Sequence, residues 1–383
     1  MLNPHLHVTS KPPRLKSLRF ALGIPLALAA LVACSSSGTK SAAPDITTPN
    51  TAASNTAAPN TTAPTAANSD ANSPGASATG PLTKVSVALD FTPIQGFMVP
   101  VVVAKELGYY KDAGLDLSID VGSSSTTGIQ QVDAGKTTFG YVDVGKAALA
   151  VNKGAKVTAV AVYMQKNQGT VIARASEGIT SPDKLAGKSV GTTTGSSSET
   201  DFLAMLAVNG ISKDSMTIQS VSSASKIATL LSGKVDAITG FLGSECVQVK
   251  LAIKDDVNCL PVADYGVSSL GEGIVVSNQT LADSPDVVKA FLDATDRAWQ
   301  YSLDHPQEAV DTAQKSYPLA KADLLLAQFN ESKSLLHTDA TKDCTVGYMS
   351  PQDWDSTVDF LKKYAKLDSS AVATTFYHNI LSC

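Results

Sequence analysis

The sequence predicts an α/β fold in which parallel-rich sheets are flanked by helices. Segments with the period of a strand, such as 84–91 (KVSVALDF), alternate with segments of helical spacing, such as 125–135 (STTGIQQVDAG). Several of the helical segments close on a glycine, which is typical of a helix end. Strands joined by helices of this length pair in parallel through right-handed crossovers, so the pattern indicates sheets with helices on their faces.

The first 33 residues have the order of features of a bacterial secretory signal. They include four basic residues, Lys11, Arg14, Lys16 and Arg19. The apolar run from 20 to 33 falls short of the roughly 20 residues that a membrane span needs. It ends in Leu31-Val32-Ala33-Cys34, which resembles the lipobox of bacterial lipoproteins. We expect cleavage before Cys34 and lipidation of its sulfur; an ordinary signal peptide, or an anchor helix with an incidental cysteine, is the alternative.

Residues 34–81 are expected to form a linker. They consist mainly of Ser, Thr, Ala, Pro, Asn and Gly, with almost no large apolar side chain. Such a segment cannot bury enough apolar surface to offset the entropy lost on ordering. A coil of this length reaches roughly 35 to 45 Å. It would therefore hold a folded body clear of the outer face of the cell membrane while the lipid stays inserted.

The body begins near residue 84 with alternating strands and helices. The expected strands are 84–91, 116–122, 137–145, 156–164, 169–175, 188–193 and 273–277. The expected helices are 97–108, 125–135, 181–187 and 197–210, with further alternation across 220–241. After Asn278 only helical patterns remain, at 284–304, 306–316, 321–336, 353–365 and 370–381. Trp299 falls on the apolar face of the first of these, so we expect it in the core.

The composition gives no indication of a nucleic-acid partner. The formal net charge is −5, and neither a basic stripe nor a zinc-ligand spacing of cysteines occurs. Without the first eighty or so residues, about 300 remain, which is enough for one large or two ordinary domains.

Four cysteines follow Cys34, an even number that fits an exported protein in an oxidising compartment. Three pairings are possible. We favour Cys246–Cys259 and Cys344–Cys383, because each pair lies within one stretch of chain that the fold keeps together. Four buried free thiols are the alternative.

Several phrases of the body resemble one protein family in a fixed order. Residues 89–119 (LDFTPIQGFMVPVVVAKELGYYKDAGLDLSI) look like the opening of bacterial type II periplasmic solute-binding proteins of the nitrate, sulfonate and thiamine-pyrimidine class. The phrases TTFGYVDVG, SPDKLAGKSVGTTTGSSSE and LLSGKVDAITGF then follow in the order in which that family has them. The resemblance runs from about residue 84 to residue 303.

The resemblance implies a two-lobed α/β fold in which two crossing segments join the lobes and a ligand is clamped between them. On this basis residues 84–174 together with 275–383 form the first lobe, and residues 175–274 form the second. In open α/β sheets, ligands lie beyond the carboxyl ends of the strands, where loops meet helix N-termini. The loops that follow the strands are therefore the expected ligand contacts.

The candidate ligand contacts are polar or aromatic residues of these loops. They are Asp90, Phe91, Gln95 and Phe97 after the first strand, Ser124 and Ser125 after the second, Tyr141 and Asp143 after the third, Thr194, Ser196 and Ser197 in GTTTGSSSET, and Phe241 and Glu245 in GFLGSEC. Asp90 offers an acceptor for an amino or amidine-like group, or it is an N-cap or hinge residue. The rings can stack on a flat ligand.

The two serine-rich loops place hydroxyl and backbone N–H groups at helix starts, which suits an anion, although plain capping is equally compatible. The loop around Gly195 resembles the oxyanion-binding turn of sulfonate and nitrate binders, but Glu199 nearby weakens the case for a fully charged anion. Glu245 is either a ligand contact or a surface charge beside a disulfide.

The first loop departs from the thiamine-pyrimidine branch of the family. Members of that branch typically read LDWxPNxxH, whereas this chain has Phe91 for the tryptophan, Ile94 for the asparagine and no counterpart of the histidine. These differences put an aminopyrimidine ligand in doubt. Flavin-like, sulfonate, nitrate and other small aromatic solutes stay open.

The resemblance implies an extracytoplasmic, lipid-anchored receptor that delivers a small solute to the permease and ATPase of an ABC importer. We expect a monomer that binds and closes without making or breaking a bond, with no catalytic residue, cofactor, metal or nucleic-acid partner. The alternative is an enzyme of thiamine-pyrimidine synthesis on the same fold. Such enzymes carry a cysteine-rich motif and an active-site histidine, whereas His305, His337 and His378 are scattered here in the helical tail.

Overall fold

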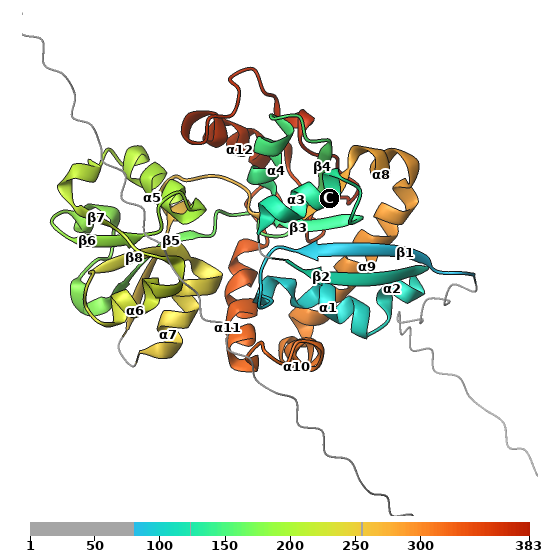
Figure 1. Cartoon of the computed structure of the whole chain (residues 1–383), viewed down its shortest axis with the longest axis horizontal. Helices are drawn as coiled ribbons and strands as arrows, with labels where there is room; N and C mark the ends of the chain where they lie inside the picture. The colour runs from blue at the N-terminus through green and yellow to red at the C-terminus, as the bar shows by residue number, and fades with distance from the viewer. Residues whose placement is uncertain (1–79, 123, 254–255) are drawn as a thin grey trace, which may run out of the picture. The chain divides into compact units, whose positions relative to one another are not determined.

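The computed structural model describes residues 80–122, 124–253 and 256–383 (Figure 1). All of them belong to one compact unit, Asp70–Cys383. The expected signal at 1–33, Cys34 and nearly all of the expected linker at 34–81 lie outside the described residues. Within the described part of the chain, no helix is both long and apolar enough to cross a membrane.

The first of two five-stranded sheets has the order β2-β1-β3-β10-β4. Its strands are β1 (Thr83–Leu89), β2 (Leu115–Val121), β3 (Phe139–Asp143), β4 (Val157–Val162) and β10 (Glu272–Ser277). β1 runs parallel to β2 and β3, whereas β10 runs antiparallel to β3 and β4. The carboxyl ends of β1 and β3 and the start of β10 therefore meet at one edge.

The second sheet has the order β7-β6-β8-β5-β9. Its strands are β5 (Gly169–Arg174), β6 (Ser189–Thr192), β7 (Thr217–Ser220), β8 (Ala237–Phe241) and β9 (Val257–Pro261). β6 runs parallel to β7 and β8, and β5 runs antiparallel to β8 and β9. The two sheets thus share one plan, with a single antiparallel strand in the fourth position.

In each sheet the antiparallel strand is the one that has just crossed from the other sheet. Residues 163–168 lead from β4 to β5, and residues 262–271 lead from β9 to β10. The boundaries expected from the sequence assign 169–174 to the first lobe and 272–274 to the second. Strand pairing instead joins β5 to the second sheet and β10 to the first, because an apolar strand pattern does not record which sheet it pairs with.

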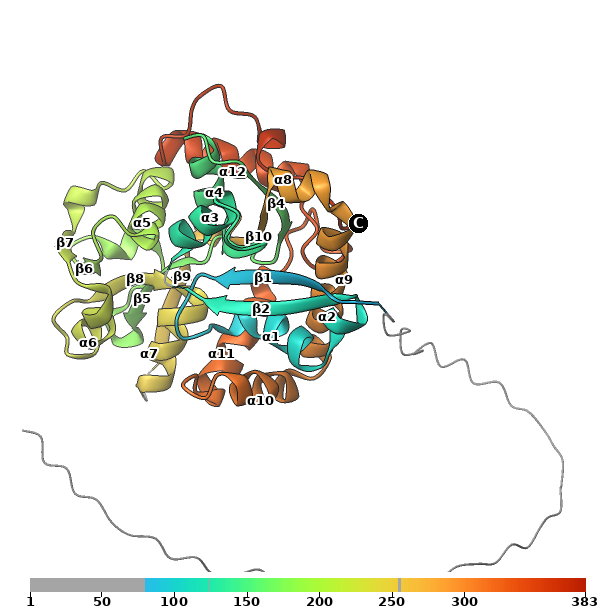
Figure 2. The same cartoon turned by 45° about the vertical axis from the view of Figure 1, so that its right-hand side comes forward.

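Helices cover both faces of the sheets (Figures 1 and 2). Their bounds are α1 Val99–Glu106, α2 Tyr109–Asp112, α3 Ser125–Asp133, α4 Val144–Val151, α5 Ser197–Val208, α6 Lys226–Leu231, α7 Val247–Ala252, α8 Asn278–Asp283, α9 Pro285–Asp304, α10 Pro306–Ser316, α11 Ala322–Ser332 and α12 Pro351–Tyr364. α3, α4 and α12 lie on one face of the first sheet, and α1 and α9 on the other. We call the first sheet with α1, α2, α3, α4 and α8 to α12 the first half, and the second sheet with α5, α6 and α7 the second half.

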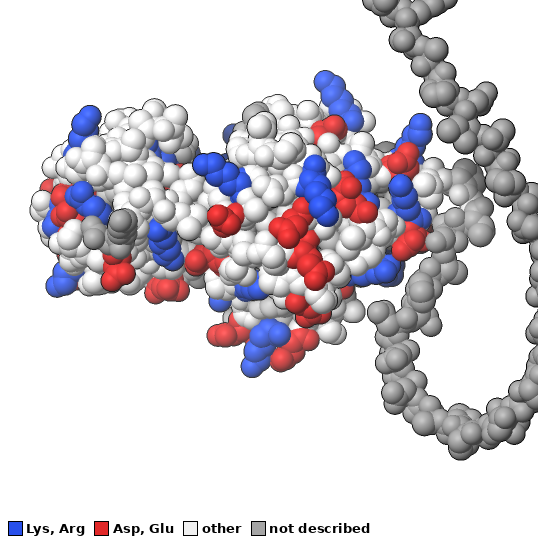
Figure 3. All heavy atoms as spheres, turned by 90° about the horizontal axis from the view of Figure 1, so that it is seen from below, with Lys and Arg blue, Asp and Glu red and all other residues white. Residues whose placement is uncertain are grey.

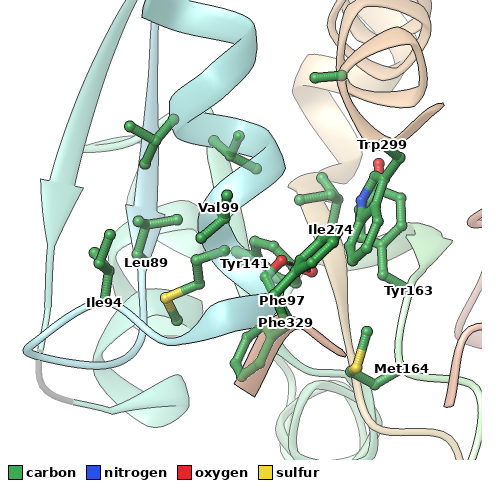
Figure 4. Packing of buried hydrophobic residues seen from close by; sticks show 14 of the residues in the cluster. Leu89, Ile94, Phe97, Val99, Tyr141, Tyr163, Met164, Ile274, Trp299 and Phe329 are labelled. Carbon is green, nitrogen blue, oxygen red and sulfur yellow. Dashed lines mark hydrogen bonds between the residues drawn. The ribbon is translucent and has the colours of Figure 1, made fainter. Parts of the chain in front are cut away.

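The core of the first half includes a row of aromatic rings, several of which Figure 4 shows. Trp299 of α9 is fully buried, as its place on the apolar face of the helix predicts. Its ring lies 5.4 Å from that of Tyr163 and 5.9 Å from that of Phe329. Burial of each large aromatic side chain contributes on the order of 2 to 3 kcal/mol, so this row anchors α9 and α11 to the first sheet.

Two expected helices take other forms. Residues 181–187 contain only a short 3-10 helix, Pro182–Leu185. Residues 370–381, expected to be helical, contain the 3-10 helix Ala373–Thr375 and then run beside β4. The N–H of Ala159 donates to the carbonyl of Phe376, and the N–H of His378 donates to the carbonyl of Ala159. Pairing with the edge strand therefore satisfies this backbone in place of a helix.

The four cysteines of the body lie in the pairs expected from the sequence. Cys246 and Cys259 have their Cα atoms 6.2 Å apart and their sulfur atoms at bonding distance. Cys344 and Cys383 are brought together in the same way, although they lie 39 residues apart in the chain.

Candidate functional site

A cavity of about 230 Å³ lies between the two halves. Its wall includes Asp143 and Glu272 from the first half and Asp201 and Phe241 from the second. Both crossing segments also contribute residues to it, namely Asn167, Gln168, Ser269, Leu270 and Gly271. A larger hollow of about 580 Å³ opens beside the same crossings, but its described lining residues come from loops and helices only. The ends of strands from both sheets therefore meet at the smaller cavity.

Strand pairing explains why three carboxylates lie together at the edge of the first sheet. Glu272, the first residue of β10, lies opposite Asp143, the last residue of β3. Leu89, the last residue of β1, lies opposite Tyr141, so Asp90 leaves its strand beside Asp143. The parallel strands end at the edge where the antiparallel strand begins, and this brings the three acids to one place.

Ser125 connects two of these acids. Its hydroxyl donates to Asp90 Oδ2 at 2.6 Å and accepts from the backbone N–H of Asp143 at 3.3 Å. Asp90 is only 2% exposed, and its Oδ1 is buried without a hydrogen-bond partner among the described residues. Asp143 is the N-cap of α4 and accepts from the backbone N–H of Lys146 at 2.8 Å. Capping thus fixes Asp143 and leaves Lys146 in the first turn of α4.

Adjacent residues of one crossing segment bind an acid in each half. Asn167 Nδ2 donates to Asp201 Oδ1 at 3.1 Å, and the side-chain amide of Gln168 donates to the carboxylate of Glu272. Asn167 also donates to Ser269 Oγ at 2.8 Å, so it joins the two crossing segments. These bonds hold a carboxylate of each half at the cavity.

The four acidic side chains at this site lie close together, and little positive charge near them offsets their burial. Burial raises the pKa of Asp90 and of Asp201 to about 7. Burial, with the nearby charges of Asp90 and Asp143, raises the pKa of Glu272 well above its ordinary value, and burial raises that of Asp143. The charge of Lys146 moderates each increase. No group of three or more His, Cys, Asp or Glu within the described residues is arranged to hold a metal ion.

The turn before α5 already holds a carboxylate of the chain itself. Ser196 caps the helix by accepting from the N–H of Glu199 at 3.2 Å. Glu199 Oε2 in turn accepts from the N–H of Gly195 at 2.6 Å. Gly195 has φ +77°, which a glycine adopts without strain. One backbone donor of this turn, the N–H of Gly195, is therefore engaged by Glu199.

Three of the residues expected to contact a ligand line the cavity: Asp143, Ser197 and Phe241. Asp90 and Ser125 lie behind the wall, next to Asp143. Ser124 and Ser196 serve as N-caps of α3 and α5.

The other expected contacts have structural partners away from the cavity. Phe97 and Tyr141 are buried in the core, where the hydroxyl of Tyr141 donates to the carbonyl of Phe97 at 3.1 Å (Figure 4). Phe91 packs edge-on against Phe97, with ring centroids 6.0 Å apart. These rings pack in or against the apolar core because burying an aromatic ring is lower in free energy than leaving it exposed in a loop.

The remaining polar residues of the expected set form hydrogen bonds or ion pairs with other residues of the chain. Gln95 Oε1 accepts from Gln328 Nε2 at 2.6 Å, and the hydroxyl of the exposed Thr194 forms a hydrogen bond with the hydroxyl of Ser220. Glu245 forms a 2.7 Å ion pair with the buried Lys226 and accepts from the N–H of Phe241. The structure thus places Glu245 in a supporting position, one turn behind the wall residue Phe241.

Sequence reasoning missed most of the wall, including the polar residues Lys146, Asn167, Gln168, Asp201 and Glu272. Asn167 and Gln168 lie in a crossing segment, where no periodicity marks a role. Glu272 gave a usable signal, since it is a charged residue that opens the otherwise apolar strand EGIVVS. Asp201 lies in the first turns of α5 and reads as an ordinary polar helix residue.

A model of the family described as NMT1/THI5 like matches residues 97–309, which is more than half of the chain. The chain belongs to the NMT1/THI5-like family. This finding confirms the family resemblance that the ordered phrases of the sequence predict.

Other proteins similar to this NMT1/THI5-like chain include binding proteins and enzymes. It is 28% identical over 298 residues to the riboflavin-binding protein RibY of Chloroflexus aurantiacus, and this match covers 76% of this chain and 83% of RibY. It is 25% identical over 309 residues to the formylaminopyrimidine-binding protein of Halalkalibacterium halodurans, and this match covers 80% of this chain and 92% of that protein. It is also 26% identical over 265 residues to the 4-amino-5-hydroxymethyl-2-methylpyrimidine phosphate synthase of Candida albicans. This match covers 64% of this chain and 77% of the synthase.

A solved structure confirms the fold class of this NMT1/THI5-like protein. The periplasmic aliphatic sulphonate binding protein SsuA from Escherichia coli matches with a TM-score of 0.63 at 14% identity, covering 78% of this chain and 98% of that one. The α/β fold with two sheets flanked by helices is therefore that of the periplasmic binding proteins.

Proposed function

We propose that this protein is the solute-binding component of an ABC importer and clamps a small solute in the cavity between its two halves. One observation carries the proposal: the cavity is lined by side chains from both halves and from both crossing segments. A solute in this position contacts both halves at once and stabilises their closed arrangement. The family membership and the binding proteins among the relatives support this function.

The two halves serve as the lobes, and the crossing segments at 163–168 and 262–271 serve as the hinge. Polar bonds hold the hinge to the cavity wall, through Asn167 and Gln168. The halves also pack against each other where α11 meets α7, and there Lys250 Nζ of α7 lies 3.6 Å from Glu331 Oε2 of α11. This pair is partly exposed, so it contributes little and can break when the halves move.

The anchor and the location follow from the first 81 residues. Cleavage before Cys34, lipidation of that cysteine and a linker at 34–81 would hold the body at the outer face of the cell membrane, where a permease and its ATPase receive the solute. We expect the protein to work as a monomer. In that oxidising compartment the pairs Cys246–Cys259 and Cys344–Cys383 form disulfides, for which the closeness of their sulfur atoms is the support.

The enzyme alternative rests on relatives such as the Candida albicans synthase. Among the described residues that line the cavity, none is a histidine or a cysteine, the side chains that most often act as acid–base or nucleophilic groups.

A thermal-shift panel tests the proposed function. Riboflavin, formylaminopyrimidine, alkanesulfonates, nitrate and small organic cations are added to the purified protein, and the solution is assayed for turnover. We expect one class to raise the melting temperature by several degrees, and Phe241→Ala to abolish the shift, while Leu251→Ala, an exposed change in α7, preserves it. Turnover of a solute, or a shift that Phe241→Ala leaves intact, contradicts the proposal.

A further inference from the structure

The cavity wall has more acidic side chains than the basic side chains around it can neutralise. Asp201 is 8% exposed and Glu272 is 7% exposed, yet both line the cavity. Each uses one oxygen to accept from a crossing-segment amide. The hydrogen bonds given by side chains of the described residues reach only one oxygen of each group, Asp201 Oδ1 and one oxygen of Glu272. Two carboxyl groups more than nine-tenths buried at the cavity thus each keep an oxygen without a side-chain donor.

Positive charge near these oxygens is scarce. No lysine or arginine of the described chain forms an ion pair with Asp90, Asp143, Asp201 or Glu272. Lys146 is the one cationic side chain among the described residues that line the cavity. On the outer face seen in Figure 3, by contrast, basic and acidic residues are interspersed. The excess of acid at the cavity is therefore not repeated on that face.

A buried carboxylate without a counter-charge is costly, because desolvation is not offset by attraction. A ligand that brings a positive charge, or several N–H donors, supplies the missing partner. A ligand that brings a sulfonate or nitrate group is repelled by the ionised forms of Asp143, Asp201 and Glu272. The N–H of Gly195, one backbone donor of the turn before α5, is already engaged by Glu199.

The rest of the wall indicates the body of the ligand. Phe241 from the second half and Phe360 from α12 both line the cavity, together with Leu149 and Leu361. Aromatic faces bind flat groups and cations. A volume of about 230 Å³ limits the solute to a compact molecule.

We propose that the cavity selects a compact solute with a cationic nitrogen group, such as a protonated amine or amidine, on a flat or apolar body, and rejects solutes whose only charged group is an oxyanion. The cation lies against Asp201 and Glu272, and the body lies between the rings of Phe241 and Phe360. This inference rests on the proposed function and names the solute class of the same site.

Three probes that differ chiefly in charge test the inference. Benzamidine, benzamide and benzoate share one flat ring and carry one positive, no and one negative charge. Their binding to the purified protein is measured by isothermal titration calorimetry at pH 7, in two buffers of different ionisation enthalpy. The inference predicts that benzamidine binds at least tenfold more tightly than benzamide, that benzoate does not bind, and that benzamidine binding releases protons to the buffer.

The proton release has a direct cause. The groups that face one another at the wall or just behind it are Asp90, Asp143, Lys146, Asp201 and Glu272, beside the buried hydroxyl of Tyr141. Because burial raises the pKa of each carboxyl group among them, an entering cation favours their ionised forms and expels protons. An entering anion favours the protonated forms and takes protons up. The sign of the exchange therefore reports the charge that the site accepts.

Two isosteric variants and one control locate the effect. Asp201→Asn and Glu272→Gln each replace a carboxyl group that a cation would ionise by a neutral amide, and each should weaken benzamidine binding by roughly tenfold or more. Asp116→Asn replaces a carboxyl group by an amide at an exposed position in β2 and should leave the binding unchanged. Circular dichroism melting confirms that each variant is folded.

Equal binding of the three probes, binding of none, or proton uptake on binding overturns the inference. The proposed function fails on separate grounds: if an alkanesulfonate or riboflavin binds and Phe241→Ala abolishes that binding, the function stands and the cationic class is wrong. Loss of benzamidine binding in both wall variants but not in Asp116→Asn supports the inference.

Discussion

The side-chain amide of Asn167 donates a hydrogen bond to Asp201 Oδ1 over 3.1 Å, from a crossing segment to the first turns of α5. The next residue, Gln168, binds Glu272 in the same way on the other side of the cavity. A connection between two sheets thus serves as part of the wall that faces both. The hinge and the site are for this reason one structure, and a solute that alters the charge at either acid also acts on the hinge.

Asn167→Ala should destabilise the protein. The change removes the bonds from Asn167 to Asp201 and Ser269, and it leaves the N–H of Gly169, which donates to Asn167 Oδ1 at 2.7 Å, without that acceptor. Loss of partners for buried polar groups costs about 1 to 3 kcal/mol. Urea unfolding monitored by circular dichroism measures the difference. Asn330→Ala, an exposed change in α11, is the control and should shift the unfolding free energy by less than about 0.5 kcal/mol.

The stability of the unliganded protein should depend on pH through Asp201. Burial raises the pKa of its carboxyl from 3.8 to about 7, so the folded state retains a proton that the unfolded chain loses. Stability contributed by this group therefore falls as pH rises from about 4 to 7 and levels off above. Asp183, Asp236 and Asp368, whose pKa values are lowered, act in the opposite sense at acid pH.

Comparison with a variant isolates this contribution. Asp201→Asn keeps an acceptor for Asn167 but cannot ionise. We expect the variant to match the wild type near pH 4 and to exceed its unfolding free energy by on the order of a few kcal/mol at pH 8. Denaturant titrations across this range check the trend. A difference that is independent of pH would show that Asp201 does not hold the proton.

Glu245 should matter for stability rather than for binding. It pairs with Lys226, which is 3% exposed, at 2.7 Å, and it accepts from the N–H of Phe241. Breaking a buried ion pair by removing one partner costs about 3 to 5 kcal/mol. Glu245→Gln should therefore lower the unfolding free energy by a large part of that amount. At a temperature where the variant is folded, its affinity for the imported solute should lie within a few-fold of wild type; a loss of a hundredfold would make Glu245 a ligand contact.

The regular part of the fold could be predicted from the sequence because it depends on periodicity. The longer strands and most helices follow from apolar spacing, whereas the short strands β7 and β9 were not expected. Each cysteine pair was favoured because it lies within one stretch of chain that the fold keeps together, and the structure brings its sulfur atoms close. Residues 370–381 were wrongly expected to be helical. Their backbone pairs with Ala159 at the edge of the first sheet, and such a long-range partner leaves no local pattern.

The site could be predicted only in part, for a related reason. Asp143 and Phe241 end their strands, and the rule that ligands lie beyond strand ends finds them. Tyr141 is two residues before the same end, but it points into the core and is fully buried. Asn167 and Gln168 belong to neither sheet, and their role arises only when two acids from different halves meet at one cavity.

The distance between the two halves, measured with and without solute, tests the central claim most directly. Spin labels on Lys111→Cys in the first half and Lys213→Cys in the second, both at exposed positions, report this distance by pulsed electron paramagnetic resonance. The account predicts a distance distribution that narrows and shifts by several ångströms when the solute giving the largest thermal shift is added, and no shift in the same labelled protein carrying Phe241→Ala. A distribution that the bound solute leaves unchanged would contradict a receptor that closes around its ligand.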